Sequence, residues 1–267
     1  MTIITSDHQI LKLTSYGTGT AIIFISGYSG TSQSWSAQND FFSQLGFQCL
    51  HLDKRGHGEN AAVTSGMRIS RLATDLKTLI DQLELKAFHL VSHSLGCAIA
   101  CDYISLFGEA GIQSLTIVDS SPKPIQTADW SLGLDQLTWD NLLTTSEQLI
   151  RTPLTQKKIP TALLRKMNQP PYPFDLVQTQ PLLLDFLSKD YRDVLDRLQL
   201  PLLYIAGEQS PLFPTGLIAY YQETNPTART YLAAGSGHLP YAECADDFNQ
   251  VLLSFLQAHP EQNEASA

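Results

Sequence analysis

Five short, mostly apolar runs recur along this chain, and stretches with helical spacing lie between them. The runs have the length of strands and occupy residues 21–25, 48–52, 87–91, 115–118 and 202–205. Strands that are buried on both faces have this composition. Residues 69–83 place isoleucine and leucine at steps of three and four, which is the spacing of an amphipathic helix. The alternation predicts the α/β class, with a mostly parallel central sheet flanked by helices.

Residues 1–121 and 198–259 carry this alternation and are expected to form one core domain, with antiparallel edge strands around Ile3 and Leu11. Residues 122–197 interrupt it, because they hold eight prolines and leucine-rich helical pieces but no convincing strand. The side chains of this stretch are too apolar for a solvated linker, so we expect an inserted helical cap. Residues 260–267 are polar and are expected to form a flexible tail.

The charge balance limits the partners of the chain. Asp plus Glu number 26 and Lys plus Arg number 17, for a net charge of −9, which disfavours nucleic acid and anionic membranes as partners. No run reaches the roughly 20 apolar residues of a membrane span, and the amino terminus lacks the pattern of a secretory signal, so we expect a cytoplasmic location. The four cysteines are scattered in apolar segments, which predicts buried thiols and no metal site.

Ser94 stands where one strand run meets a helical run, within Ser92-His93-Ser94-Leu95-Gly96. A serine on a sharp strand-to-helix turn, with small residues two before and two after it, is typical of a nucleophile elbow. Ser92 occupies the first small position, where glycine is usual. A second interpretation is a helix N-cap, in which Ser92 or Ser94 accepts the first free N–H groups of the helix.

A serine nucleophile needs a base, and His238 is the best candidate among the seven histidines. It lies in the glycine-rich loop Gly235-Ser236-Gly237-His238, which follows the apolar run at 229–232 and precedes an amphipathic helix near the carboxyl terminus. Loops at strand ends are where a sheet presents its chemistry. His93 is too close to Ser94 along the chain to act easily as its base.

Four motifs occur together in this chain, in a fixed order: the Ser26-Gly27-Tyr28-Ser29-Gly30 loop, the Asp53-x-Arg55-Gly56-His57-Gly58 turn, Ser92-x-Ser94-x-Gly96, and Gly237-His238-x-Pro240. In order and approximate spacing they resemble the α/β-hydrolase fold superfamily, in its branch with a serine nucleophile and a helical cap. The resemblance covers the sheet-forming parts of the chain, at about 21–119 and 202–255.

The resemblance implies an oxyanion hole built from two backbone amides, those of Tyr28 and Leu95. Two fixed donors of this kind stabilise the negative oxygen that develops during acyl transfer. A histidine usually precedes the glycine of the first loop, and this chain has Ser26 there. The substitution keeps the backbone donor but changes the side-chain bonds that hold the loop.

The triad acid is the point at which the chain departs most from the family. The usual position, three residues after the glycine of the next-to-last core strand, holds Ser210, which cannot carry a negative charge. Asp119, at the end of the preceding strand, and Glu208, on the customary loop, are the two candidates. We favour Asp119, because a strand end fixes a short side chain better than a loop fixes a longer one.

The expected function is that of a serine hydrolase, which cleaves a small, apolar carboxylic ester or related acyl compound through Ser94, His238 and an acid, without cofactor. Three alternatives remain. They are a cofactor-free dioxygenase, a perhydrolase or haloperoxidase-like enzyme, and a small-molecule receptor with vestigial activity. Trp130, Trp139, Leu154, Tyr172 and Phe174 could line an apolar pocket, although packing within the cap is the favoured role for most of them.

Overall fold

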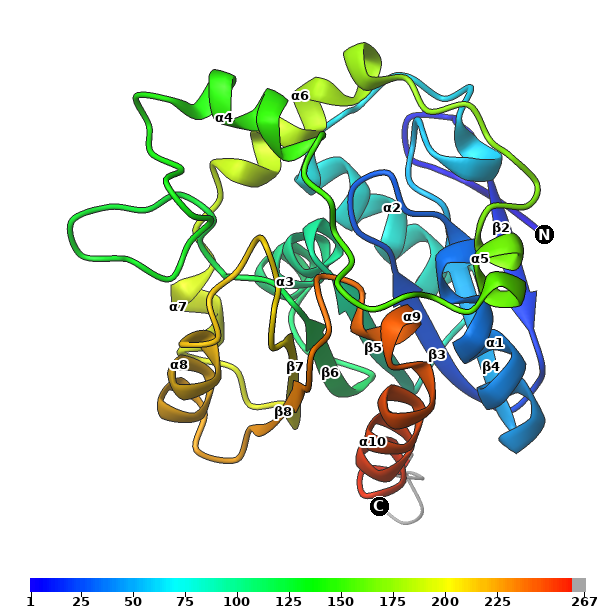
Figure 1. The fold of residues 1–267 in the computed structure, drawn as a ribbon. Helices are drawn as coiled ribbons and strands as arrows, with labels where there is room; N and C mark the ends of the chain where they lie inside the picture. The colour runs from blue at the N-terminus through cyan, green and yellow to red at the C-terminus, as the bar shows by residue number, and fades with distance from the viewer. Residues whose placement is uncertain (261–267) are drawn as a thin grey trace.

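The computed structural model describes residues 1–260, and an eight-stranded sheet forms their centre (Figure 1). The strands are β1 (Thr2–Ile4), β2 (Ile10–Tyr16), β3 (Thr20–Ile25), β4 (Phe47–Leu52), β5 (Phe88–His93), β6 (Ile112–Val118), β7 (Leu202–Gly207) and β8 (Arg229–Ala233). Their order in the sheet is β1-β2-β4-β3-β5-β6-β7-β8. Strand β2 pairs antiparallel with both β1 and β4, and the other pairs are parallel. The predicted α/β class and antiparallel edge are confirmed.

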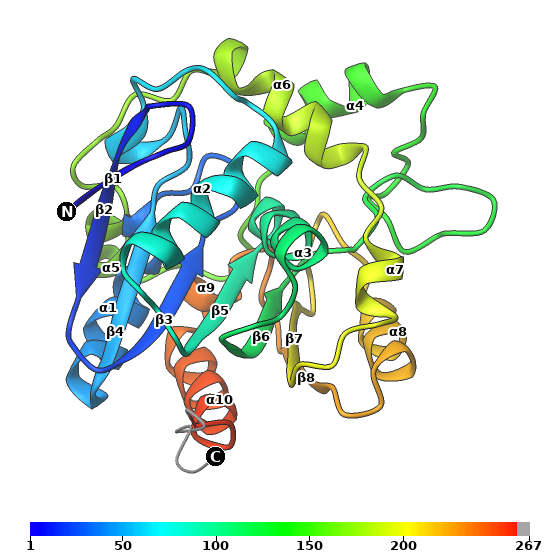
Figure 2. The same cartoon turned by 180° about the vertical axis from the view of Figure 1, so that it is seen from behind.

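Helices cover both faces of this sheet, because successive side chains of a strand point to opposite sides. On β3, Ile22 and Phe24 belong to one apolar cluster, whereas Ile23 and Ile25 belong to the other. Figure 2 shows α2 (Ile69–Gln82) and α3 (Leu95–Phe107) in front of the sheet, with α1 (Ser36–Phe42) and α10 (Ala245–Gln257) behind it. The remaining helices of the core are α8 (Leu217–Thr224) and α9 (Pro240–Glu243), and short 3-10 turns are η1 (Ser32–Trp35), η2 (Ser43–Leu45) and η3 (Gly58–Asn60).

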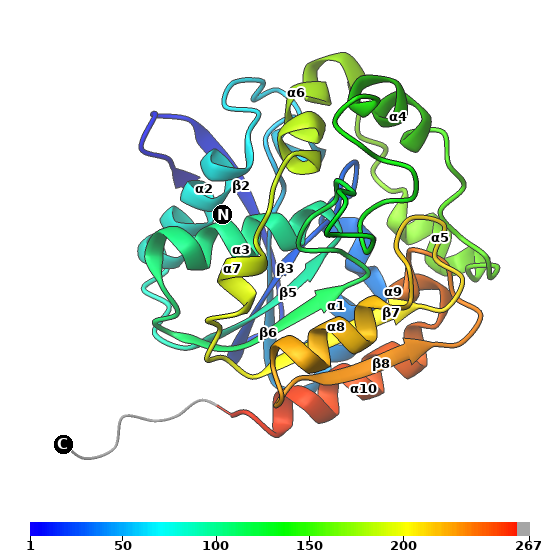
Figure 3. The same cartoon turned by 90° about the vertical axis from the view of Figure 1, so that its left-hand side faces the viewer.

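Four helices lie between β6 and β7, in the stretch for which a cap was expected. They are α4 (Leu142–Leu149), α5 (Thr161–Met167), α6 (Leu176–Leu187) and α7 (Arg192–Leu195). Helices α4 and α6 pack together, and Figures 1 and 3 place them at the end of the molecule away from α10. Helix α5 lies beside α1, and α7 packs against α3. The boundaries at 122 and 197 stay predictions.

Two tryptophans of the stretch 122–197 differ in their exposure to solvent. Trp130 is buried, but Trp139 is 58% exposed, so the packing role favoured for most of the five pocket candidates does not apply to Trp139. The loop that carries it leaves its ring in solvent.

Of the tail predicted at 260–267, residues 261–267 lie outside the described part. Within residues 1–260, the helices are all too short or too polar to cross a membrane.

A buried arginine joins the amino-terminal edge of the sheet to its first long helix. Arg55 follows β4, and its guanidinium is wholly buried. Its Nε lies 2.7 Å from Asp75 Oδ2 on α2, and its Nη1 lies 2.7 Å from Asp7 Oδ2 in the β1–β2 turn. These hydrogen bonds from Arg55 hold the pKa of the Asp7 carboxyl well below its usual range.

We predict that Arg55→Met destabilises the fold, because it leaves Asp75 buried without a cation. Breaking a buried pair in this way lowers the free energy of unfolding by about 3–5 kcal/mol. Urea unfolding followed by circular dichroism measures the change. Arg197→Met, at an arginine whose side chain is 82% exposed, is the control and should change the value by less than about 0.5 kcal/mol. A loss below 1 kcal/mol for Arg55→Met would contradict the assignment.

Candidate active site

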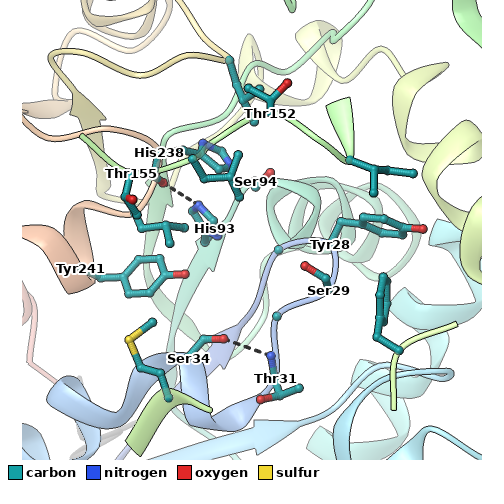
Figure 4. Close-up of a pocket in the computed structure, with 18 of the residues that line it drawn as sticks. Tyr28, Ser29, Thr31, Ser34, His93, Ser94, Thr152, Thr155, His238 and Tyr241 are labelled. Atoms are coloured by element: carbon teal, nitrogen blue, oxygen red, sulfur yellow. Dashed lines mark hydrogen bonds between the residues drawn. The ribbon is translucent and has the colours of Figure 1, made fainter. Parts of the chain in front are cut away.

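A cavity of about 940 Å³ lies between the core and the stretch that follows β6. The core supplies loops at the carboxyl ends of β3, β5 and β8, which carry Tyr28, Ser94 and His238. The opposite wall is mostly apolar and includes Leu154, Phe174, Leu183 and Phe186. Figure 4 shows Tyr28, His93, Ser94, His238 and Tyr241 around this space. The strand ends therefore deliver polar groups into a largely apolar chamber.

Ser94 sits on a sharp turn between β5 and α3. Its backbone has φ 52° and ψ −123°, a conformation that residues other than glycine rarely adopt. A side chain at Gly96 would meet the carbonyl oxygen of Ile25 at 2.3 Å, so the helix can begin here only with glycine at that position. This is the strand, serine turn and helix that the sequence predicted.

The helix-cap interpretation of these serines is wrong. Ser94 holds the N-cap position of α3, but its side chain makes no capping hydrogen bond. The Ser92 hydroxyl donates instead to the carbonyl of Thr116 on β6, at 2.9 Å. That bond satisfies a buried hydroxyl where glycine is more usual. Among residues 1–260 the Ser94 hydroxyl has no hydrogen-bond partner, so it is free to rotate when a substrate is present.

His238 and Asp119 form a buried pair beside Ser94. The distance from His238 Nδ1 to Asp119 Oδ2 is 2.6 Å, and both residues are at most 2% exposed. Asp119 comes directly after β6, where its backbone adopts φ 43°. Because the carboxylate accepts the Nδ1 proton, the Nε2 atom of the neutral ring carries a lone pair. The ring can therefore accept a proton at that atom.

Ser210 and Glu208 lie near this pair in different ways. Ser210 donates its hydroxyl to Asp119 Oδ2 at 2.6 Å, and the Gly207 amide donates to Asp119 Oδ1 at 3.0 Å. The exposed Glu208 accepts instead from the amide of Gly235, at 2.7 Å. The structure therefore brings Asp119, and not Glu208, to the histidine. The serine at the family's usual acid position has become a hydrogen-bond donor to an acid on the neighbouring strand.

The loop after β3 passes directly beside Ser94. A side chain at Gly27 would come within 2.8 Å of His93 Nδ1 and 3.0 Å of Ser94 Cβ, so only glycine fits there. Tyr28 follows, and its hydroxyl makes a 2.8 Å hydrogen bond with Thr179 on α6. Leu95 is the first residue of α3, so its amide has no partner within the helix. Leu95 directly follows the serine and Tyr28 follows the glycine that lies against it, so both predicted donor residues belong to segments next to Ser94.

Three of the five residues named for a possible apolar pocket line the cavity. They are Leu154, Tyr172 and Phe174, whereas Trp130 and Trp139 do not line it. His93, which the sequence set aside as a base, also lines the cavity. Its Nε2–H donates to the His238 carbonyl, 2.9 Å away, and so supports the backbone of that loop.

Glu243 holds the histidine loop, and the sequence analysis missed it. Its carboxylate is 8% exposed and accepts backbone N–H groups from Gln156, Lys157, Gly237 and Leu239, at 2.7–3.1 Å. Two of these amides flank His238, and the other two belong to the stretch opposite the core. A lone carboxylate five residues after the histidine, in an apolar segment, was the signal available. The residue joins the histidine loop to the opposite wall of the cavity.

We predict that Glu243→Gln lowers both stability and any activity of the site, because the amide side chain has one acceptor oxygen where the carboxylate has two. The free energy of unfolding should fall by about 1–3 kcal/mol, the cost of buried donors left unpaired. Chemical denaturation measures it. Glu109→Gln is the matched control, since Glu109 accepts one exposed amide, that of Gln199. Equal effects for the two variants would contradict the proposed clamp.

Comparisons with known proteins agree with this architecture. A family model described as alpha/beta hydrolase fold matches residues 20–244. The chain is 25% identical to a non-heme haloperoxidase from Rhodococcus erythropolis, over 95% of this chain and 98% of the relative. It is 26% identical to a pimeloyl-[acyl-carrier protein] methyl ester esterase from Nitrosomonas europaea, over 89% and 96%.

A solved structure, that of an esterase from Exiguobacterium antarcticum, superposes with a TM-score of 0.86 at 20% identity and covers 96% of this chain and 99% of its own. At that identity the likeness concerns the fold. The family model spans strands β3 to β8, the serine turn and the histidine loop together, and ends just after α9. The chain therefore belongs to the α/β-hydrolase fold family.

Proposed function

We propose that this protein is a serine hydrolase that cleaves a small carboxylic ester or related acyl compound. The 2.6 Å pair of His238 and Asp119, on the same cavity as Ser94, carries the proposal. A histidine held in one tautomer by a buried carboxylate is what a serine needs in order to lose its proton. The relatives named above, an esterase among them, favour the same reaction class.

In the proposed mechanism, Ser94 Oγ attacks the carbonyl carbon of the ester while His238 Nε2 takes the hydroxyl proton. The amides of Tyr28 and Leu95 hold the negative oxygen of the tetrahedral intermediate. His238 then gives the proton to the departing alcohol, which leaves an acyl group on Ser94. Water, deprotonated by His238, releases the acid and restores the serine. Asp119 stabilises the imidazolium that forms in each half of the reaction.

The substrate is proposed to be largely apolar. Leu154, Phe174, Leu183 and Phe186 line the wall opposite Ser94, and this wall lies within the stretch 122–197. We infer that this stretch acts as a cap that selects the acyl compound, with 1–121 and 198–259 as the catalytic core. Apolar pockets of this size bind ligands mainly through burial of apolar surface.

A perhydrolase is the second candidate, because one of the relatives is named as a non-heme haloperoxidase. The same acyl-enzyme would be attacked by hydrogen peroxide in place of water and would release a peracid. An assay of short esters with and without peroxide separates the two candidates. Faster turnover of the ester with peroxide, to give a peracid, than with water alone would favour the perhydrolase.

We predict that Asp119→Asn lowers kcat for a p-nitrophenyl ester by about 10⁴-fold, because the histidine loses the carboxylate that holds its tautomer. Glu208→Gln is the matched control, and its kcat should stay within about threefold of the parent, because Glu208 is exposed and bonds only a loop amide. Stopped-flow or plate assays give both values. Collapse of the Glu208 variant with an active Asp119 variant would assign the acid to Glu208.

We also predict that a fluorophosphonate labels Ser94 and abolishes ester turnover. The reagent captures an activated serine, so Ser94→Ala should show no adduct by mass spectrometry of the digested protein. Ser92→Ala keeps the nucleophile and serves as the control. An unmodified Ser94 after exhaustive treatment of the folded parent would contradict the proposed nucleophile.

A further inference from the structure

A buried lysine lies beneath the loop that carries Tyr28. Lys54 comes two residues after β4, is 4% exposed, and makes no ion pair among residues 1–260. Burying a charged group without a counter-ion is costly unless hydrogen bonds replace its water. The position of this side chain therefore requires an explanation beyond packing.

All the hydrogen bonds of the Lys54 ammonium go to one loop. Its Nζ donates to Ser26 Oγ at 2.8 Å, to the Gly30 carbonyl at 3.0 Å and to the Ser26 carbonyl at 3.2 Å. An ammonium group has three N–H donors, so each has an acceptor here. The three acceptors lie at the two ends of residues 26–30, and Tyr28 is at the centre of that loop.

Ser26 completes the arrangement. Its hydroxyl accepts from Lys54 and donates to the Gly30 carbonyl at 3.0 Å, and the Gly30 amide donates to the Gly27 carbonyl at 3.0 Å. Ser26 is the position at which the family usually has a histidine. In this chain, a short hydroxyl and a lysine from the next loop together fill that place.

We propose that Lys54 is a positioning residue for the oxyanion hole. It holds loop 26–30 so that the Tyr28 amide faces the carbonyl oxygen of a substrate bound at Ser94. The proposal rests on the hydrolase function proposed above. Lys54 does not contact the substrate; it acts through the backbone of the loop. Ser26 and Lys54 hold the loop together, at the place where the family usually has one histidine.

The charge of Lys54 also extends toward the cavity. Burial lowers the pKa of His93 and of His57, and the Lys54 ammonium lowers both further. Asp53 lies on the other side, and its carboxylate accepts from the amides of Ser32 and Glu59. Within residues 1–260, Asp53, His57 and His93 are the titratable groups whose electrostatic interaction with Lys54 is resolved. A positive charge near the cavity floor favours a developing oxyanion.

Lys54→Met tests the proposal, because methionine fills similar space without donors. Since the oxyanion exists only in the transition state, kcat for a p-nitrophenyl ester should fall by about 10–100-fold while KM changes less than about threefold. Lys86→Met, at an exposed lysine between α2 and β5, is the control and should leave both constants unchanged. Ser26→Ala should lower kcat by a smaller factor, about 3–10-fold, since two acceptors remain.

The pH profile distinguishes positioning from a purely structural role. Burial lowers the pKa of Lys54 to about 7, and Asp53 opposes this shift. As pH rises through that value the ammonium loses a proton, so one loop acceptor loses its donor and the positive charge disappears. The kcat of the parent should therefore decline above neutral pH. Lys54→Met should lack that decline.

Three outcomes overturn the proposal. One is a kcat of Lys54→Met within twofold of the parent. Another is a lower kcat with the alkaline decline retained. The third is a Ser26→Ala variant with full activity when Lys54→Met fails to fold. Fluorophosphonate labelling of the parent is run in parallel, so that an unreactive Ser94 reports failure of the hydrolase function and not of Lys54.

Discussion

Each polar group of the candidate site is attached to the carboxyl end of a strand whose two faces are covered by helices. In a parallel sheet these ends lie along one edge, so strands far apart in the sequence deliver their loops to the same place. The serine turn follows β5, the aspartate follows β6, and the histidine loop follows β8. Burial of both faces keeps these ends rigid. The site therefore depends on the apolar packing of Ile22, Ile23 and their equivalents, far from any chemistry.

Much of this could be predicted from the sequence. The strand runs and the helix at 69–83 have periods that report burial directly, and Ser94 and His238 lie in motifs with a mechanical reason for their spacing. Glu243 and Lys54 could not be found this way, because their partners, mostly backbone groups, belong to segments remote in sequence. The exposure of Trp139 could not be predicted either, because composition reports apolarity but not burial. Ser210 was rejected as the triad acid because it cannot carry a negative charge. Its hydrogen bond to Asp119 depends on the pairing of β6 with β7, which the sequence does not show.

Three buried side chains that can carry a charge have polar partners of different kinds. Arg55 pairs with two carboxylates, Asp119 accepts three donors, and Lys54 relies on carbonyl and hydroxyl oxygens. Arg55 joins elements of the scaffold, and the other two converge on the cavity. The first arrangement stabilises the fold, whereas polar groups held at a fixed orientation around a cavity are preorganised for reaction. Arg55 and Lys54 are adjacent in sequence, so one turn after β4 serves both purposes.

The hydrogen bonds of Glu243 limit which segments of this protein could be exchanged to alter its cavity. The same carboxylate holds the amides on both sides of His238 and those of Gln156 and Lys157, and the Tyr28 hydroxyl is joined to Thr179. Replacing the stretch 122–197 by that of a relative would therefore have to reproduce backbone amides at 156–157 and a hydroxyl at 179. Residues between these two junctions are open to recombination. The junctions themselves are hydrogen-bonded to loops at the ends of β3 and β8, although they lie within the predicted insertion at 122–197.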